Sequence, residues 1–407
     1  MANTIIHHQQ SERKTTTRRA ILPPIKIITV FGTRPEAIKL APIIHGLNSD
    51  PERFRCSVVV TAQHRAMLDQ MLKVFGIKPD VDLDIMEENQ SLSLVTQKTL
   101  QRLENVIADY APDLILVQGD TTSTFVGALA GYYQKVKIAH VEAGLRTYQK
   151  YSPFPEEMNR RLTSALADIH FAPTRQAGEN LRKEGIAEQR IFITGNTVID
   201  AVNSILSVDY HFEQALLDEL LSNGRRTIVI TAHRRENWGE AFESVAQAVL
   251  QLAADYDDLQ FIFPMHLNPN VQRVFGERLG GHAQIHLCEP LDYRTFINLF
   301  GRCYFILTDS GGIQEEAPTL RKPALVMREV TERPEGMAHG CLKLVGCRVD
   351  RIIAEARRLL DDRDYYDESI QPSNPFGDGR ATRRIMQAIL YEFGIVPTRP
   401  NDFTAET

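Results

Sequence analysis

The sequence contains no uninterrupted apolar stretch near the roughly 18 residues that a membrane-spanning helix needs, so we expect a soluble protein. Residues 1–22 lack the apolar segment of a secretory signal, and we expect residues 1–24 to form a flexible arm. A tether to an anionic surface or an organelle targeting peptide is the alternative for this basic segment. The five cysteines form no CxxC pair, so we expect neither a disulfide framework nor a structural zinc site. This favours a location in the reducing cytoplasm.

A strong charge of one sign is also absent. The chain has 46 Lys and Arg residues against 52 Asp and Glu residues, and its net charge of −6 argues against a general binder of nucleic acids or anionic membranes. Any phosphate-binding site must therefore be local. The chain has neither a GxxxxGKS/T loop nor a GxGxxG fingerprint, so ATP hydrolysis and dinucleotide redox chemistry lose their usual sequence support.

The sequence does contain a regular alternation of short β-branched runs with helix-length amphipathic segments, which is typical of parallel sheets with crossover helices. The first series of runs is 25–31, 55–61, 113–118, 136–141, 169–173 and 190–194. A weakly patterned polar region follows at 207–226. The second series is 227–231, 260–264, 284–287, 304–308, 323–327 and 341–345.

This pattern predicts an α/β protein with two Rossmann-like, doubly wound parallel-sheet domains that face a central cleft, because 407 residues exceed what one hydrophobic core usually organises. We place the first domain at 25–205 and the second at 206–380, followed by a C-terminal helix and tail at 381–407. Ligands of such sheets bind at the carboxyl ends of the strands, so the cleft is the expected site. We expect a hinge near residues 200–225 and closure of the two domains over a ligand.

Polar clusters follow the predicted strands of the first half. In FGTRPEAIK, Arg34 after a glycine turn can meet a phosphate, although it could instead simply pair with Glu36. Asp120 lies in QGDTT, Glu142 in HVEAGLRT and Glu156 in SPFPEEMNR. Acids from three strand ends that point into one cleft can take separate acid and base roles, since close carboxylates push their pKa values apart.

The second half carries groups suited to a nucleotide. His233 in TAHRREN directly follows a predicted strand and can bind phosphate or move protons. In LTDSGGIQEEAP, Ser310 can cap a helix, while the N–H groups around Gly311 and Gly312 can approach a diphosphate. Glu316, about two turns into that helix, can accept hydrogen bonds from ribose hydroxyls. These features together indicate a nucleotide sugar as the ligand.

These motifs, with GNTVIDA at 195–201, HLNPN at 266–270, ERP at 332–334 and GDG at 377–379, closely resemble those of the non-hydrolysing UDP-N-acetylglucosamine 2-epimerases. The resemblance runs in order from about residue 25 to residue 379. It implies the glycosyltransferase-B arrangement of two Rossmann-like domains in a cytoplasmic homodimer. It also implies interconversion of UDP-GlcNAc and UDP-ManNAc for surface polysaccharide, without NAD or a required metal and with no nucleic-acid or membrane partner.

The resemblance further implies a mechanism and residue roles. UDP is eliminated across carbons 1 and 2 of the sugar to give an enzyme-held 2-acetamidoglucal, and it re-adds with a proton on the opposite face. The catalytic residues by motif match are Asp120, Glu142, Glu156 and His233. The substrate-binding residues are Arg34, Lys39, Phe296, Ser310, Gly311, Gly312 and Glu316, with Phe296 near the uracil. Contacts to a second, activating UDP-GlcNAc would come from Gln63, Arg235 and His266.

Other interpretations stay open at this point. A glycosyltransferase of the same architecture would share the cleft and the diphosphate site, but it usually needs one catalytic base where this sequence offers several acids. A hydrolysing 2-epimerase, or an epimerase of a related UDP-2-acetamido sugar such as a uronate or a diacetamido form, would keep nearly every motif. A catalytically silent UDP-sugar sensor is expected to have lost at least one of the acids, and all of them are present.

Overall fold

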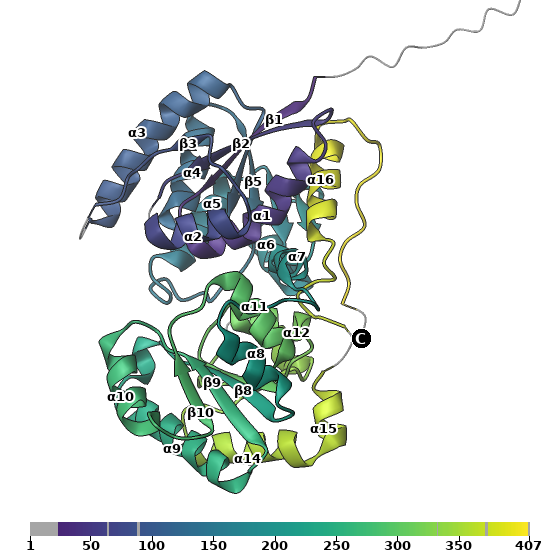
Figure 1. The fold of residues 1–407 in the computed structure, drawn as a ribbon. Coiled ribbons are helices and arrows are strands. Elements are labelled where there is room, and N and C mark those ends of the chain that lie inside the picture. Colours follow the sequence, from purple (N-terminus) through teal and green to yellow (C-terminus); the bar gives the residue numbers. More distant parts are fainter. Residues whose placement is uncertain (1–22, 63–64, 88–89, 332, 371–372, 406–407) are drawn as a thin grey trace, which may run out of the picture.

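The computed structural model describes residues 23–62, 65–87, 90–331, 333–370 and 373–405. It contains two β-sheets, one in each half of the molecule (Figure 1). The first sheet has seven strands in the order β3-β2-β1-β4-β5-β6-β7, and the second has six in the order β10-β9-β8-β11-β12-β13. All neighbouring strands pair in parallel. The predicted fold class is therefore confirmed.

The first sheet consists of β1 (Ile25–Phe31), β2 (Phe54–Val60), β3 (Val81–Asp82), β4 (Leu114–Gln118), β5 (Lys137–Val141), β6 (Ile169–Ala172) and β7 (Ile191–Ile193). The helices between and after these strands are α1 (Arg34–Asn48), α2 (Arg65–Val74), α3 (Leu92–Tyr110), α4 (Thr122–Tyr133), α5 (Glu156–Leu166), α6 (Arg175–Lys183) and α7 (Thr197–Ile205). A 3-10 turn, η1 (Glu188–Arg190), precedes β7.

The second sheet consists of β8 (Arg226–Thr231), β9 (Leu259–Pro264), β10 (Ile285–Cys288), β11 (Phe305–Thr308), β12 (Ala324–Val326) and β13 (Leu342–Leu344). Its helices are α8 (Ala215–Ser222), α9 (Glu240–Asp255), α10 (Pro269–Leu279), α11 (Tyr293–Arg302), α12 (Ile313–Thr319), α13 (Pro334–Ala338), α14 (Val349–Asp361) and α15 (Arg363–Glu368), with a 3-10 turn, η2 (Arg235–Asn237). The last helix is α16 (Ala381–Glu392).

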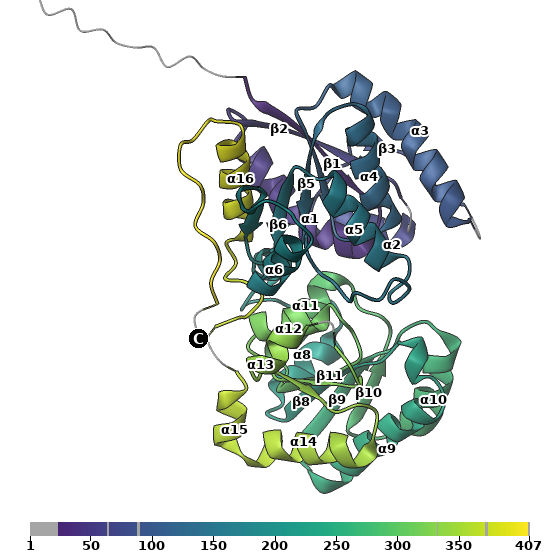
Figure 2. The same cartoon turned by 180° about the vertical axis from the view of Figure 1, so that it is seen from behind.

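Strand β1 shows how the first sheet is buried on both faces. Ile27 and Phe31 belong to one hydrophobic cluster, and Ile28 and Val30 belong to another. Successive side chains of a strand point to opposite faces, so the two clusters lie on the two faces of the sheet. Helices cover both faces (Figures 1 and 2). Burial on both faces explains why this strand is mostly apolar and does not alternate apolar with polar residues, with Lys26 its one exposed position.

The last part of the chain returns to the first half of the molecule. Helix α16 packs against α1 and α7 (Figure 1). Beyond it, the N–H of Phe403 donates to the carbonyl of Ile193 at 2.7 Å, and the Asp402 carboxylate accepts the N–H of Ile193 at 3.1 Å. The tail thereby covers β7, the edge strand of the first sheet.

Two further findings concern the helices. Helix α8 lies within the polar region 207–226, where the sequence pattern was weak, and only Leu217 and Leu220 are its buried positions. A short helix with so narrow an apolar stripe has little periodicity to detect. Among the residues that the structure describes, no helix combines the length and the apolar character needed to cross a membrane.

We expect the first domain to lose stability as the pH falls below about 6.5. His140 on β5 is fully buried, and burial lowers its pKa to about 3, although its hydrogen bond to the Gly119 carbonyl acts in the opposite direction. The unfolded chain then binds a proton that the folded chain excludes, so this contribution is full above pH 6.5 and declines toward pH 3. In His140→Gln, the slope of unfolding free energy against pH should fall by about 1.4 kcal/mol per pH unit in urea denaturation.

The matched control for this prediction is His211→Gln, because His211 is exposed. Its slope should equal that of the wild type. An unchanged slope in His140→Gln would show that His140 does not contribute to acid sensitivity.

Candidate functional site

A cleft of about 670 Å³ lies between the two halves of the molecule. Its walls come from the segments that follow β1, β4 and β5 in the first sheet and β8, β9 and β11 in the second, with α5 and α11. The cleft brings together the predicted residues Arg34, Lys39, Asp120, Glu142, Glu156, His233, His266, Phe296, Ser310, Gly311, Gly312 and Glu316. The carboxyl ends of both sheets therefore face one site, as expected of this fold.

A few predicted residues are not part of this cleft. Arg235 does not line it, and its guanidinium carbon lies 6.0 Å from the ring centre of Trp238. Gln63, Glu332 of the ERP motif and most of the arm, residues 1–22, lie outside the described residues. Within the described part of the chain, no group of three or more His, Cys, Asp or Glu side chains is arranged to hold a metal ion.

Glu142 follows β5, and three side chains donate hydrogen bonds to its carboxylate. Its backbone φ is 65°, in the left-handed region that costs a non-glycine residue about 1 kcal/mol or more. Its carboxylate accepts hydrogen bonds from Lys39 and Gln118 and, at 3.3 Å, from Asn196, the N-cap of α7. A strained backbone with a fully engaged carboxylate at a cleft is typical of a functional residue.

The other two acids, Asp120 and Glu156, line the same cleft and also belong to the first domain. The Asp120 carboxylate after β4 is 2.9 Å from Nε and 2.7 Å from Nη2 of Arg160. Glu156 is the first residue of α5, so Arg160 follows it by one helical turn. Arg160 was not predicted from the sequence, although this spacing of four residues puts both side chains on one face of the helix.

In the second domain, His233 after β8 is oriented by a buried acid. Its Nδ1 lies 3.2 Å from the carboxylate of Asp309, which also accepts the N–H groups of His233 and Arg234 at 2.9 Å each. Burial alone would raise the pKa of Asp309, but His233 and these N–H groups outweigh it and lower the pKa. The rings of His233 and His266 are stacked with their centres 5.7 Å apart. Burial and the neighbouring His233 lower the pKa of His266.

The turn at 310–312 differs from its prediction in two details. Ser310 does not cap α12, because Gly312 occupies the N-cap position and α12 begins only at Ile313. For the same reason Glu316 lies in the first turn of α12 and not two turns in. The open backbone is as expected, since a Cβ built on Gly312 would meet nothing within 4 Å.

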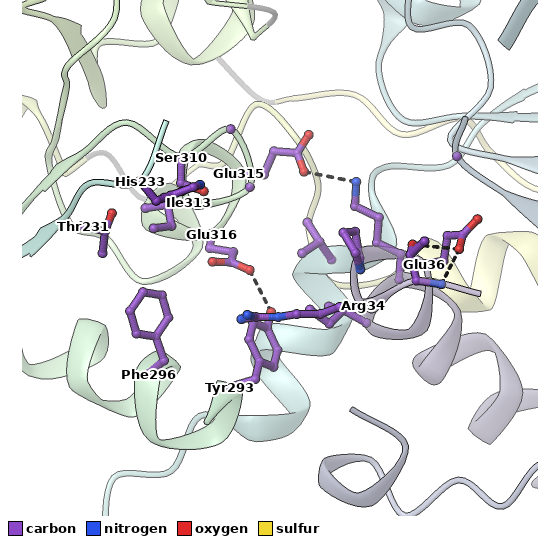
Figure 3. A pocket seen from close by; sticks show the side chains of 18 of the residues that line it. Arg34, Glu36, Thr231, His233, Tyr293, Phe296, Ser310, Ile313, Glu315 and Glu316 are labelled. Atoms are coloured by element: carbon purple, nitrogen blue, oxygen red, sulfur yellow. Dashed lines mark hydrogen bonds and ion pairs between the residues drawn. The ribbon is translucent and has the colours of Figure 1, made fainter. Parts of the chain in front are cut away.

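Glu316 lies among aromatic groups deep in the cleft. It accepts a hydrogen bond from the hydroxyl of Tyr293 at 2.9 Å, and burial raises its pKa. Figure 3 shows Phe296 beside this pair, and Arg34 reaching toward it from the first domain. The guanidinium carbon of Arg34 is 5.8 Å from the ring centre of Tyr293. Tyr293 was not predicted, although it lies one turn before Phe296 on α11.

Glu36 anchors the loop after β1. Its carboxylate accepts the N–H groups of Gly32 at 2.9 Å and Thr33 at 2.7 Å, and also the hydroxyl groups of Thr33, Thr121 and Thr124. These partners replace the simple pair with Arg34 that the sequence left as an alternative. Burial raises the pKa of Glu36, although the hydrogen bonds act against this shift.

Two further charged residues that line the cleft come from the second domain. Glu315 on α12 is 3.5 Å from Nζ of Lys39, and it accepts a hydrogen bond from Nε of Arg333 at 2.9 Å. Figure 3 shows Glu315 pointing across the cleft to this ammonium group. Both residues stand in motifs quoted above, but only the structure shows that Glu315 contacts Lys39 and that Arg333 contacts Glu315.

Two parallel-sheet α/β domains with a polar cleft between them define a glycosyltransferase-B fold. The model of the UDP-N-acetylglucosamine 2-epimerase family matches residues 46–390. The chain belongs to this family of isomerases, as the sequence motifs indicated.

Three relatives illustrate the similarity. The UDP-N-acetylglucosamine 2-epimerase of Bacillus subtilis is 49% identical over 94% of this chain and 99% of its own. The structure of S. aureus MnaA with UDP has a TM-score of 0.84 at 48% identity and covers 93% of this chain and all of its own. The UDP-GlcNAc 2-epimerase of Neisseria meningitidis bound to UDP-GlcNAc has a TM-score of 0.81 at 45% identity, over 90% of this chain and all of its own.

We expect Glu36→Gln to reduce the free energy of unfolding by about 1–3 kcal/mol. The amide NH₂ of glutamine cannot accept a hydrogen bond, so buried N–H or hydroxyl donors of the loop would lose their partner. Urea denaturation at neutral pH measures the change. Glu52→Gln, at an exposed position before β2, is the control and should change stability by less than about 0.5 kcal/mol. Equal stability of the two variants would contradict the anchoring role.

Proposed function

We propose that the protein is a non-hydrolysing UDP-N-acetylglucosamine 2-epimerase that interconverts UDP-GlcNAc and UDP-ManNAc. The main support is one cleft in which three acids of the first domain face the glycine turn, His233 and Glu316 of the second. A UDP-sugar fits this division, with its nucleotide on the second domain and its sugar near the acids. Relatives with UDP and with UDP-GlcNAc have the same fold.

The chemistry explains why the site needs both acids that carry protons and groups that bind the diphosphate. The hydrogen on carbon 2 is barely acidic until the bond from carbon 1 to UDP loosens and builds positive charge on the ring. A base then takes that proton while UDP leaves with the bonding electron pair, which gives 2-acetamidoglucal. UDP re-adds at carbon 1 as a second group delivers a proton to carbon 2 from the opposite face. The two faces therefore need separate proton carriers.

We assign these roles to residues as follows. Asp120, Glu142 and Glu156 carry protons, and His233 takes part in catalysis by stabilising the leaving diphosphate. Arg34 and the backbone N–H groups of 310–312 also contact the diphosphate, Glu316 holds the ribose and Phe296 lies near the uracil. Lys39, assigned to substrate binding by motif, contacts two carboxylates in this structure.

The setting of this activity is part of the proposal. The protein acts as a homodimer in the cytoplasm, without NAD or a required metal, and it supplies UDP-ManNAc for surface polysaccharide. It has no nucleic-acid or membrane partner. A second UDP-GlcNAc that activates the enzyme would contact Gln63, Arg235 and His266, of which His266 lines the cleft beside His233.

Proton NMR of the purified protein with UDP-GlcNAc in deuterated water tests the function. We expect UDP-ManNAc to form with deuterium at carbon 2 and with little free UDP, because the intermediate stays bound. Accumulation of UDP and free ManNAc would instead identify a hydrolysing epimerase. Absence of exchange would overturn the proposal and direct the search to a modified sugar or to a transferase acceptor.

We expect Asp120→Asn, Glu142→Gln and Glu156→Gln each to reduce turnover by about 10²- to 10⁴-fold. Each substitution removes a group that can exchange a proton but preserves its shape. The affinity for UDP, measured by calorimetry, should stay close to that of the wild type because the nucleotide lies on the other domain. Near-normal turnover in all three variants would contradict the acid/base assignment.

A further inference from the structure

Four buried charged side chains form a cluster that joins the two domains. Lys39 on α1 and Glu142 after β5 come from the first domain, whereas Glu315 on α12 and Arg333 before α13 come from the second. Their side chains are 11%, 8%, 3% and 14% exposed. Lys39 contacts both carboxylates, and Arg333 contacts Glu315.

The cluster is electrically balanced. Burial alone would lower the pKa of Lys39, but the carboxylates of Glu142 and Glu315 outweigh it and raise the pKa. Burial would raise the pKa of Glu315, but Arg333 and Lys39 outweigh it and lower the pKa. Lys39 and Glu315 are therefore both charged at neutral pH, and two cations face two carboxylates.

Glu315 is the member of the cluster that competes with Glu142 for the ammonium group of Lys39. An ammonium group that served Glu142 alone would bind that carboxylate strongly and oppose its uptake of a proton. Because Glu315 belongs to the other domain, it can attract the same ammonium only when the two domains are together. The contact thus connects the relative position of the domains to the electrostatics around an acid of the active site.

We propose that Glu315 is a positioning residue that acts through Lys39: when the domains close, it shares the ammonium group and so releases Glu142 for proton transfer. This inference rests on the proposed function, since it requires that Glu142 exchange a proton with the sugar. Opening of the cleft removes Glu315 and leaves Glu142 held by Lys39. Proton transfer is thereby restricted to the closed enzyme, in which the glycal intermediate cannot escape.

Among the residues that the structure describes, the surrounding groups do not supply a substitute for Glu315. The charges that act most strongly on Lys39 are Glu142, Glu315 and Arg333. Glu316, the next residue of α12, is hydrogen-bonded to Tyr293. On α7, the acid Asp200 is directed to the first residues of α16. Glu142 itself receives the neutral amides of Gln118 and Asn196.

The test compares Glu315→Gln with Glu315→Asp, and with Glu329→Gln as a matched control that removes an exposed acid. We expect Glu315→Gln to lower kcat by about 10-fold or more and to leave the calorimetric Kd for UDP within about threefold. The acid limb of its kcat–pH profile should move to lower pH, because Lys39 then stabilises the carboxylate of Glu142 without competition. Glu315→Asp should recover part of kcat, and Glu329→Gln should match the wild type.

The double variant Glu315→Gln, Arg333→Gln distinguishes positioning from mere stability. It restores charge balance by removing one carboxylate and one cation, so it should fold even where the single variant does not. We expect its unfolding midpoint to approach that of the wild type while kcat and the pH profile stay altered. Recovery of wild-type kcat in this variant would overturn the inference and leave Glu315 a purely structural role.

The remaining outcomes are equally decisive. An active wild-type enzyme together with an unchanged kcat and pH profile in Glu315→Gln would refute the role of Glu315 alone. A wild-type protein that neither epimerises UDP-GlcNAc nor exchanges deuterium into it would refute the proposed function, and the inference with it.

Discussion

Charges buried at the junction of two domains must neutralise one another, and the candidate site is built around this constraint. Removing an ion from water costs several kcal/mol, and only a close partner of opposite charge offsets the cost. Lys39 finds one partner in its own domain, Glu142, and one across the cleft, Glu315. Separation of the domains therefore changes the balance at a proposed catalytic acid. Of the three proposed proton carriers, Glu142 is the one whose charge environment depends on closure of the domains.

A second constraint comes from the sheets themselves, and both domains meet it in the same way. In a parallel sheet, the loop after a central strand leaves backbone N–H groups at the site, and these need acceptors. Glu36 accepts two successive N–H groups after β1, and Asp309 accepts two successive N–H groups after β8. Each buried acid fixes the loop that carries a proposed anion-binding residue, Arg34 in one domain and His233 in the other.

The sequence was sufficient for the fold, and most of the site residues predicted from it do line the cleft. The alternation of β-branched runs with amphipathic helices determines a parallel sheet, and parallel sheets place their functional residues after the strands. Arg34, Asp120 and Glu142 could be found in this way because each directly follows an apolar run. His233 and the 310–312 turn follow their strands likewise.

The sequence could not show which side chains of the site contact one another. Glu315 and Lys39 are 276 positions apart, and no periodicity connects them. Arg160 and Tyr293 look like ordinary helix residues until their contacts with Asp120 and Glu316 are known. The exact start of α12 was also missed, because a Gly-Gly turn lets the chain delay helix formation by two residues after the serine.

The GDG motif shows how a recognised pattern acquires a physical meaning from the structure. The chain crosses between the domains a second time before α16, and there Gly377 packs against the start of α7. A Cβ on Gly377 would lie 3.0 Å from Ile199 and 3.3 Å from the backbone nitrogen of Asn196. The N–H of Asn196 donates to the carbonyl of Phe376 at 2.7 Å, and its amide reaches Glu142. A side chain at 377 would therefore press on the start of α7, whose N-cap residue Asn196 also contacts Glu142, so this glycine links the connection between the domains to the active site.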